Sequence, residues 1–230
     1  MQKPYCKICD ADACVNRCVL YDSLTEEQIE ILRPGKEICE YRRKDILEKK
    51  GFTTPHIVFV CRGWAKVFID TPYNKQYLIE VIGKERFITT SFVGFGHSLT
   101  TVMALTDLKI CYFDLADMLK VAELNGKFAV ALLKHFNING TLRFQRLASI
   151  ALKQTRGKLA DAILYIYQNF QEVNMYDLIS RKDLADLANI SNENAIRTLR
   201  DFEEEGVVKS EKKTIIILDM ERLEKISQRG

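Results

Sequence analysis

Four cysteines near the amino terminus are the residues whose type and spacing most directly suggest chemistry. They are Cys6, Cys9, Cys14 and Cys18, four of the seven cysteines in a chain of 230 residues. Four thiolates so close together could close a tetrahedral zinc site unaided, or could act as a thiol redox switch without a metal. The first residues, MQKPYCKICDADAC, lack the apolar core of an export signal, so we expect a cytoplasmic protein. In a reducing compartment such a cluster favours metal or redox chemistry over structural disulfides.

A second set of polar side chains lies between residues 180 and 208, where two short helices are expected. Ser180 can cap the first helix, and Ser191 can cap the second. Gly206 then ends the second helix, because glycine adopts the left-handed conformation most easily. The apolar spacing predicts a buried face of Ala195, Ile196, Leu199 and Phe202, with Asn192, Glu193, Arg197 and Arg200 outside. This pattern is typical of a DNA-binding helix-turn-helix, although a helical hairpin packed in a core would have the same periodicity.

Residues 35 to about 113 have the pattern of a β-domain. Short β-type runs alternate with turn signals such as Lys50-Gly51 and Arg62-Gly63. The expected strands cover residues 37–41, 45–49, 56–61, 65–69, 76–82, 98–104 and 108–113. Many short strands at this spacing predict an all-β roll or barrel with one small interior. Cys39 and Cys61 fall in these strands and are expected to be small buried apolar residues.

Residues 115 to about 154 turn helical and carry one long apolar stripe. Its members are Ala129, Leu132, Leu133, Phe136, Leu142, Leu147 and Ile150. A stripe of this length predicts an extended helix that packs on a partner helix, either in a dimer or within the chain, and we favour the dimer. Asn139 and Gly140 interrupt the stripe, so a kink or a close helix crossing is expected there. Seven Lys and Arg and no acidic residue fall between Lys127 and Lys158, which suits phosphate contacts or a solvated helix face.

The remaining features exclude some classes of protein. A further helix is expected over residues 158–170 and a β-hairpin wing over 207–219. The net charge of +3 neither supports nor excludes a nucleic-acid partner. The chain contains no run of 18 apolar residues, so we expect no membrane partner. It also lacks a glycine-rich phosphate loop, an HExxH motif and a recognisable nucleophile–base motif, and we therefore expect no enzymatic activity.

The order of β-roll, long helix and winged helix-turn-helix resembles the Crp/Fnr family of bacterial transcription regulators. Three local matches carry the resemblance: RGKLADAIL at 156–164 resembles the family's entry helix, residues 180–208 its DNA-reading unit, and DLKICYFD at 107–114 its last roll strand. The resemblance implies an α+β fold with an N-terminal double-stranded β-helix, a jelly roll like the cyclic-nucleotide-binding domain. A long dimerisation helix and a C-terminal winged helix-turn-helix follow. We therefore expect a cysteine-rich segment over 1–20, the β-roll sensor over 21–114, the dimerisation helix and hinge over 115–155, and the DNA-binding domain over 156–230.

The resemblance also implies DNA-reading roles. In the family, a glutamate and an arginine four residues later read a core containing a G·C pair, and Glu193 and Arg197 stand at those positions. A carboxylate can accept a hydrogen bond from cytosine N4, and a guanidinium can donate two hydrogen bonds to guanine. On an isolated helix, the Glu193 and Arg197 side chains would instead form an ion pair. The preceding reading position holds Asn192, which can pair with adenine. Ser191 and Arg181 are expected to contact phosphates. The implied partners are double-stranded DNA with a two-fold symmetric operator, a second copy of the chain, and RNA polymerase.

The same resemblance bears on the signal that the roll would sense. The family's cyclic-nucleotide pocket needs a glutamate for the ribose and an arginine for the cyclic phosphate, and Thr90 and Ser98 stand at about those positions. Neither side chain supplies the charge that a buried phosphate requires, and His97 cannot replace a bidentate arginine at neutral pH. Arg86 lies too early in the chain for this role. We therefore expect an effector other than cAMP.

The cysteines resemble those of the oxygen-sensing branch of the family, which ligates a [4Fe–4S] cluster through three N-terminal cysteines and one in the roll. Cys111 lies close to the position of the roll ligand, and Cys18 resembles the last N-terminal ligand. That branch has the spacing Cys-x2-Cys-x5-Cys, whereas one N-terminal cysteine is surplus here. The expected metal ligands are Cys6, Cys9, Cys14, Cys18 and Cys111, with a [4Fe–4S] cluster favoured and zinc, haem or no cofactor left open. The alternative is a roll that binds another small molecule, with incidental cysteines.

Overall fold

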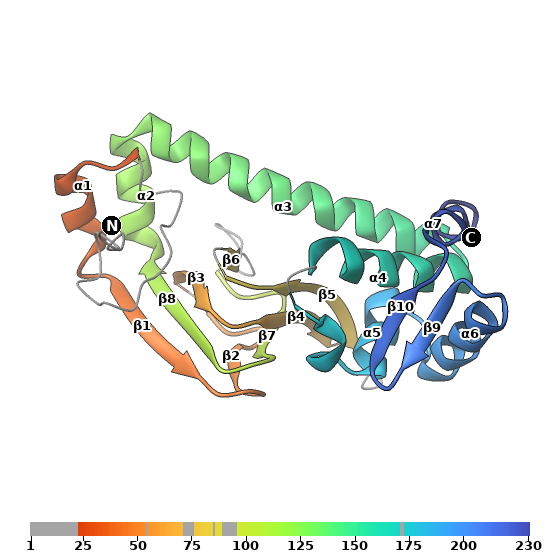
Figure 1. Ribbon diagram of the computed structural model, residues 1–230. Helices are drawn as coiled ribbons and strands as arrows, with labels where there is room; N and C mark the ends of the chain where they lie inside the picture. The colour runs from red at the N-terminus through yellow and green to blue at the C-terminus, as the bar shows by residue number, and fades with distance from the viewer. Residues whose placement is uncertain (1–22, 54, 71–75, 85, 89–95, 171–172) are drawn as a thin grey trace, which may run out of the picture. The chain divides into compact units, whose positions relative to one another are not determined.

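The computed structural model describes residues 23–53, 55–70, 76–84, 86–88, 96–170 and 173–230 (Figure 1). Several residues of interest lie outside the description: Cys6, Cys9, Cys14, Cys18, Thr90, and the side chains of Asn139 and Leu142. The chain divides into two compact units. The first unit comprises residues 1–69 and 80–141, and the second comprises 70–79 and 142–230.

Two four-stranded sheets form the expected β-roll. The first has the order β1 (Lys36–Tyr41), β8 (Leu108–Asp114), β3 (His56–Arg62) and β6 (Phe87–Ile88). The second has the order β2 (Ile46–Glu48), β7 (Thr101–Ala104), β4 (Ala65–Asp70) and β5 (Gln76–Ile82). Each of the seven expected runs contains a strand, although the run over 98–104 becomes a strand only from Thr101. The two-residue β6 was not expected, because it is too short for an alternating pattern to be recognised.

Strands β3 and β8 separate two apolar layers. Their antiparallel register pairs Phe59 with Cys111 and Val60 with Ile110. Because side chains alternate across a strand, Val60 and Ile110 are buried on one face, and Phe59 and Cys111 lie on the other. Helices α1 (Glu26–Leu32), α2 (Leu115–Leu124) and the start of α3 (Gly126–Leu152) cover this second face, where they form one apolar cluster with it.

Asn125 separates α2 from α3, which the sequence alone had left as one helical segment. Its Oδ1 atom accepts hydrogen bonds from the backbone N–H groups of Lys127 and Phe128, at 3.0 and 3.1 Å. Its Nδ2 atom donates to the carbonyl oxygen of Ser23 at 2.7 Å, which holds this helix start near α1. From there α3 runs as one helix of 27 residues through Gly140.

The second unit contains the winged helix-turn-helix. It consists of α4 (Thr155–Asn169), the short 3-10 helix η3 (Met175–Asp177), α5 (Arg181–Ala188), α6 (Asn192–Glu204), the hairpin β9 (Val208–Glu211) and β10 (Thr214–Ile217), and α7 (Met220–Arg229) (Figure 1). The expected wing pairs Val208 with Ile217 in an antiparallel register. Helix α7 was not expected from the sequence. Asp219 caps it, and Leu223 is fully buried in the second unit.

Candidate nucleic-acid interface

The turn between α5 and α6 is fixed by side-chain caps at the start of each helix. The Ser180 hydroxyl accepts from the backbone N–H of Asp183 at 3.0 Å, and the Asp183 carboxylate accepts from the backbone N–H of Ser180 at 2.8 Å. Asn189 ends α5 in the left-handed conformation with φ of 51°. The Ser191 hydroxyl then accepts from the backbone N–H of Asn194 at 3.2 Å and starts α6. Each cap satisfies a backbone donor that the helix leaves unpaired, so the turn geometry follows from local sequence.

Buried apolar side chains hold α5 and α6 together. On α5 the side chains of Leu184, Leu187 and Ala188 are each at most 2 % exposed, and on α6 the expected members Ala195, Leu199 and Phe202 are each at most 9 % exposed. The prediction for Ile196 was wrong, because this side chain is 42 % exposed. The buried stripe of α6 is therefore narrower than the periodicity suggested, and it includes Thr198, which is 3 % exposed. Threonine was not expected there, because its hydroxyl makes it resemble a surface residue in the sequence.

The far end of α6 is tied to α4 and α7 through Glu205. Arg156 donates to the Glu205 carboxylate at 2.7 Å and also lies over the Phe202 ring, 5.0 Å from its centroid. Arg222 donates to the other carboxylate oxygen of Glu205 at 2.9 Å. The basic segment from Lys127 to Lys158 is thus only partly available for phosphates. Within it Arg156 binds α6, and Lys153 pairs with Asp161 at 2.7 Å.

The residues predicted to read DNA bases lie at the start of α6 and in its first two turns. Ser191, Asn192, Glu193 and Arg197 are all exposed. Arg197 donates to the side-chain oxygen of Asn194 at 3.1 Å, and the ion pairs among the described residues do not include Glu193 with Arg197. Hydrogen bonds from its own backbone N–H and from Ser191 lower the pKa of Glu193, so this carboxylate is ionised and can accept hydrogen bonds at neutral pH.

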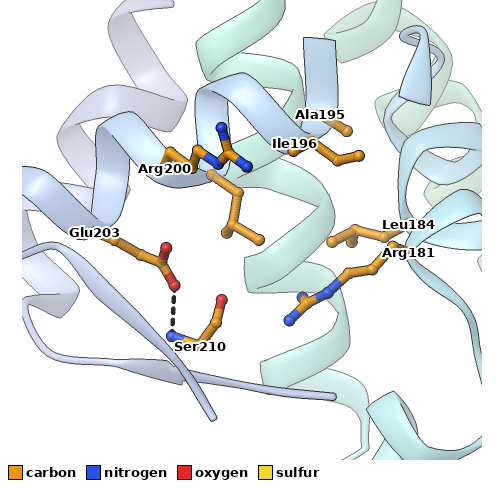
Figure 2. A pocket seen from close by; sticks show the side chains of 8 residues that line it. Arg181, Leu184, Ala195, Ile196, Arg200, Glu203 and Ser210 are labelled. Atoms are coloured by element: carbon orange, nitrogen blue, oxygen red, sulfur yellow. Dashed lines mark hydrogen bonds between the residues drawn. The ribbon is translucent and has the colours of Figure 1, made fainter. Parts of the chain in front are cut away.

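Arg181 lies apart from this surface, in a pocket of about 180 Å³ between α5, α6 and β9 (Figure 2). The pocket is lined by Arg181, Leu184, Ala195, Ile196, Leu199, Arg200, Glu203 and Ser210. Among the described residues, the Nη1 atom of Arg181 and the hydroxyl of Ser210 are buried without a hydrogen-bond partner. Burial lowers the pKa of Arg181, and the nearby Tyr176 and Glu203 partly oppose this shift. A half-buried guanidinium without a full set of acceptors favours an anionic oxygen nearby.

The wing adds basic residues that sequence reasoning had not assigned to the interface. Lys212 and Lys213 are exposed at the turn between β9 and β10, and Lys212 adopts a left-handed conformation with φ of 55°. Lys209 is also exposed but already pairs with Glu211 at 2.7 Å. The charged turn Glu211-Lys212-Lys213 was the available signal, because exposed lysines at a wing tip can reach a DNA backbone.

Of the residues considered for the sensor, the structure describes the predicted metal ligand Cys111, and Ser98, His97 and Arg86, which were judged unsuited to a cyclic-nucleotide pocket. Cys111 is 2 % exposed on β8, and its Sγ atom lies 3.5 Å from that of Cys61. The part of the chain described contains no group of three or more His, Cys, Asp or Glu side chains that could hold a metal ion. Ser98 is fully buried and donates to the carbonyl oxygen of Thr100 at 2.8 Å. His97 is exposed and Arg86 is half-buried.

Comparison with known proteins identifies the second unit. Residues 145–226 match the family model of the Crp-like helix-turn-helix domain. The chain is 20% identical over 225 residues to the CRP-like cAMP-activated global transcriptional regulator of Mycobacterium tuberculosis, covering 92% of this chain and 97% of that protein. None of the helices described is both long and apolar enough to cross a bilayer.

Solved structures share this fold over 84 to 97% of the chain. FixK2 from Bradyrhizobium japonicum superposes with a TM-score of 0.75 at 13% identity, over 85% of this chain and 98% of that one. A variant of CooA from Carboxydothermus hydrogenoformans gives a TM-score of 0.73 at 14% identity, over 97% of this chain and 100% of that one. A CRP/FNR family transcriptional regulator from Thermus thermophilus gives 0.65 at 16% identity, over 84% and 100%. Residues 145–226 therefore form a Crp-like helix-turn-helix domain, and the chain as a whole has the fold of solved transcriptional regulators of the Crp/Fnr type.

Proposed function

We propose that this chain is a cytoplasmic homodimeric regulator that reads a two-fold symmetric operator through the start of α6. The observation that carries the reading role is the exposure of Glu193 and Arg197 without an ion pair between them. Their spacing of four residues places both on one face of the helix. Glu193 would accept from cytosine N4, Arg197 would donate to guanine O6 and N7, and Asn192 would read the adjacent base pair.

Phosphate contacts would fix the register of α6 on the duplex. Ser191 stands at the exposed start of α6, where the helix dipole favours an anion. Arg181 has a buried nitrogen without a hydrogen-bond partner among the described residues, which a phosphate oxygen could satisfy. Such contacts add affinity without sequence preference, so they should dominate the salt dependence of binding.

The test begins with an operator selected from random duplex DNA by the wild-type protein. Glu193→Ala and Arg197→Ala should each weaken binding to that operator by about 1–3 kcal/mol, roughly 5- to 150-fold, and leave binding to random DNA unchanged. Glu204→Ala, an exposed carboxylate at the other end of α6, is the matched control and should bind like wild type. Equal losses on operator and random DNA would refute the base-reading role.

Dimerisation is proposed to use an exposed stripe of α3. Val130, Leu133, Phe144 and Leu147 are 50 to 74 % exposed, whereas Phe128 and Leu132 on the opposite face are buried in the first unit. With Asn137, Gly140 and Ala151, the exposed residues follow steps of three and four residues from 130 to 151, which is a heptad pattern. Gly140 would allow a close crossing, and Asn137 at a core position would select a parallel pair in one register.

The signal is proposed to be redox- or metal-linked and to act through Cys6, Cys9, Cys14, Cys18 and Cys111. Thiolates are the donors that an iron–sulfur cluster or zinc prefers. Leu24 packs on the same apolar cluster that contains Cys111. Cys18 precedes Leu24 by only six positions in the sequence. When bound, such a centre would supply an oxygen- or redox-sensitive link between the N-terminal segment and β8.

Anaerobic purification followed by a visible spectrum and metal analysis tests this signal. Cys111→Ser should lower the metal content, and Cys39→Ser, a half-buried cysteine on β1, should not. A colourless, metal-free wild-type protein prepared without oxygen would refute the metal centre. The relative from Mycobacterium tuberculosis is named as cAMP-activated. Here Ser98 is uncharged and already bonded to Thr100, which supports a different effector, and micromolar binding of cAMP in a calorimetric titration would contradict that.

A DNA-bound regulator of this kind would act on RNA polymerase, which we propose as the further partner. Transcription in vitro from a promoter carrying the selected operator tests this. Purified polymerase alone should give a transcript level that changes when the regulator is added. No change, at a concentration that saturates the operator, would argue against that partner.

A further inference from the structure

Cys61 and Cys111 are neighbouring thiols inside the first unit, and the roles described above do not use them as a pair. Their Sγ atoms lie 3.5 Å apart, although 50 residues separate them in the chain. Cys61 is 9 % exposed and Cys111 is 2 % exposed. We propose that Cys61 and Cys111 form a redox couple, which closes to an intramolecular disulfide when a hydroperoxide oxidises it.

The backbone around Cys61 is suited to this change. On β3, Val60 pairs with Ile110 and Arg62 pairs with Lys109, so the register shifts at Cys61. Cys61 is therefore the extra residue of a β-bulge, and it lies diagonally across from Cys111, which faces Phe59. A disulfide needs a sulfur–sulfur distance of about 2.05 Å, so the sulfur atoms must approach by about 1.5 Å. A bulged residue can make such a shift while the pairs on either side of it remain.

The surroundings favour a disulfide over higher oxidation states. Both thiols belong to the apolar cluster that includes Phe59, Phe87 and Met118. A disulfide is uncharged and remains compatible with this environment, whereas a sulfinate would bring a charge into it. A second thiol at 3.5 Å would also capture a sulfenic acid before a further oxidant reaches it.

The chemistry balances with hydrogen peroxide as the oxidant. Cys61 is the more exposed thiol, so its thiolate attacks one peroxide oxygen. The S–O bond forms, the O–O bond breaks, and the departing hydroxide takes up the thiol proton as water, leaving a sulfenic acid. The thiolate of Cys111 then attacks that sulfur, the S–S bond forms, the S–O bond breaks, and the hydroxide leaves with the Cys111 proton as a second water. Two thiols are oxidised and one peroxide is reduced.

Oxidation of the Cys61–Cys111 couple would change the packing at the start of α3. Phe128 and Leu132 at the start of this helix pack in the same cluster as the two cysteines. A close-packed cluster cannot absorb a sulfur shift of about 1.5 Å without moving its neighbours. The couple does not depend on the N-terminal cysteines. It excludes the proposed metal centre while oxidised, because Cys111 cannot serve both.

Peptide mapping of the full-length protein tests the proposal. The protein is treated with hydrogen peroxide, alkylated with N-ethylmaleimide under denaturing conditions and digested with trypsin. Trypsin releases Cys61 in residues 51–62 and Cys111 in residues 110–120, with one cysteine in each peptide. We expect a linked species two hydrogens lighter than the sum of these peptides, which dithiothreitol converts back. Cys39→Ser should give the same linked species, and Cys61→Ser should not.

Two outcomes of the peptide mapping would contradict the proposed disulfide. Separate alkylation of both peptides, in samples whose N-terminal cysteines have been oxidised, would overturn the proposal. A linkage of Cys111 to an N-terminal cysteine in place of Cys61 would also overturn it. Cys61→Ser retains every cysteine proposed as a metal ligand. If this variant binds as much metal as the wild type but forms no linked peptide, the redox couple is distinct from the proposed metal centre.

Discussion

Replacing Phe144 by alanine should weaken the dimer while leaving the fold of each protomer intact. The side chain is 74 % exposed in the single chain, so most of its surface is available to a partner helix. Full burial of a phenylalanine side chain contributes roughly 1.5–3 kcal/mol. A two-fold interface contains the residue twice. Scaled by the exposed fraction, the loss is about 2–4 kcal/mol per dimer, which raises the dimer dissociation constant roughly 30- to 1,000-fold.

Sedimentation equilibrium over a range of protein concentrations measures this constant directly. Phe52→Ala is the matched control, because Phe52 is 63 % exposed but lies in a loop of the roll, far along the chain from α3. It should leave the dimer unchanged. The far-UV circular dichroism spectra of both variants should match that of the wild type, which shows that each protomer keeps its fold. Wild-type dimerisation of Phe144→Ala, or equal weakening by Phe52→Ala, would refute the exposed α3 stripe as the dimer interface.

Three further changes test interactions within each unit. Ser191→Ala removes the cap of α6 and should lower the free energy of unfolding, measured with denaturant, by about 1 kcal/mol. Ser191→Gly should lower it by only a few tenths of a kcal/mol. Equal losses in the two variants would argue against a capping role. Arg156→Ala removes a contact to Glu205 and a ring contact to Phe202 and should lower stability by about 1 kcal/mol, while Lys209→Ala, which breaks an exposed pair, should change it by less than about 0.5 kcal/mol. Burial and then Arg86 lower the pKa of His135, so the unfolded chain binds this proton more readily; stability should fall as pH drops below about 6.5, and His135→Gln should flatten the melting temperature between pH 7.5 and 5.5. An unchanged pH slope in His135→Gln would rule out that histidine as its source.

Much of the DNA-reading unit could be predicted because its determinants are local. Ser180 and Ser191 cap helices within three residues of themselves, and Asn189 supplies the left-handed turn between them. The strands of the roll were likewise recognised by alternation and turn residues. By contrast, the exposure of Ile196 was missed, because periodicity marks an apolar face without revealing how far the neighbouring elements extend over it.

The burial of the apolar residues on α3 also could not be predicted from periodicity alone. Its apolar residues were treated as one stripe, but they divide between two faces of α3. Leu132 is buried in the first unit, and Leu133, its neighbour in the chain, is 60 % exposed. Both residues are leucines, so residue type alone does not distinguish the buried side chain from the exposed one. Which one serves the protomer and which one is available to a partner depends on where α1, α2 and the sheet cover the helix.

By itself, the sequence determined the order of the elements, the capped two-helix unit and the residues Asn192, Glu193 and Arg197 at its surface, because caps, turns and periodicity act over a few residues. Only the tertiary structure decided that Arg181 lines a pocket with Ser210 and that Cys61 meets Cys111. Both arrangements bring together residues far apart in the chain. They arise from the packing of helices against a hairpin and from the register of two strands, including a one-residue bulge, and no local pattern encodes either.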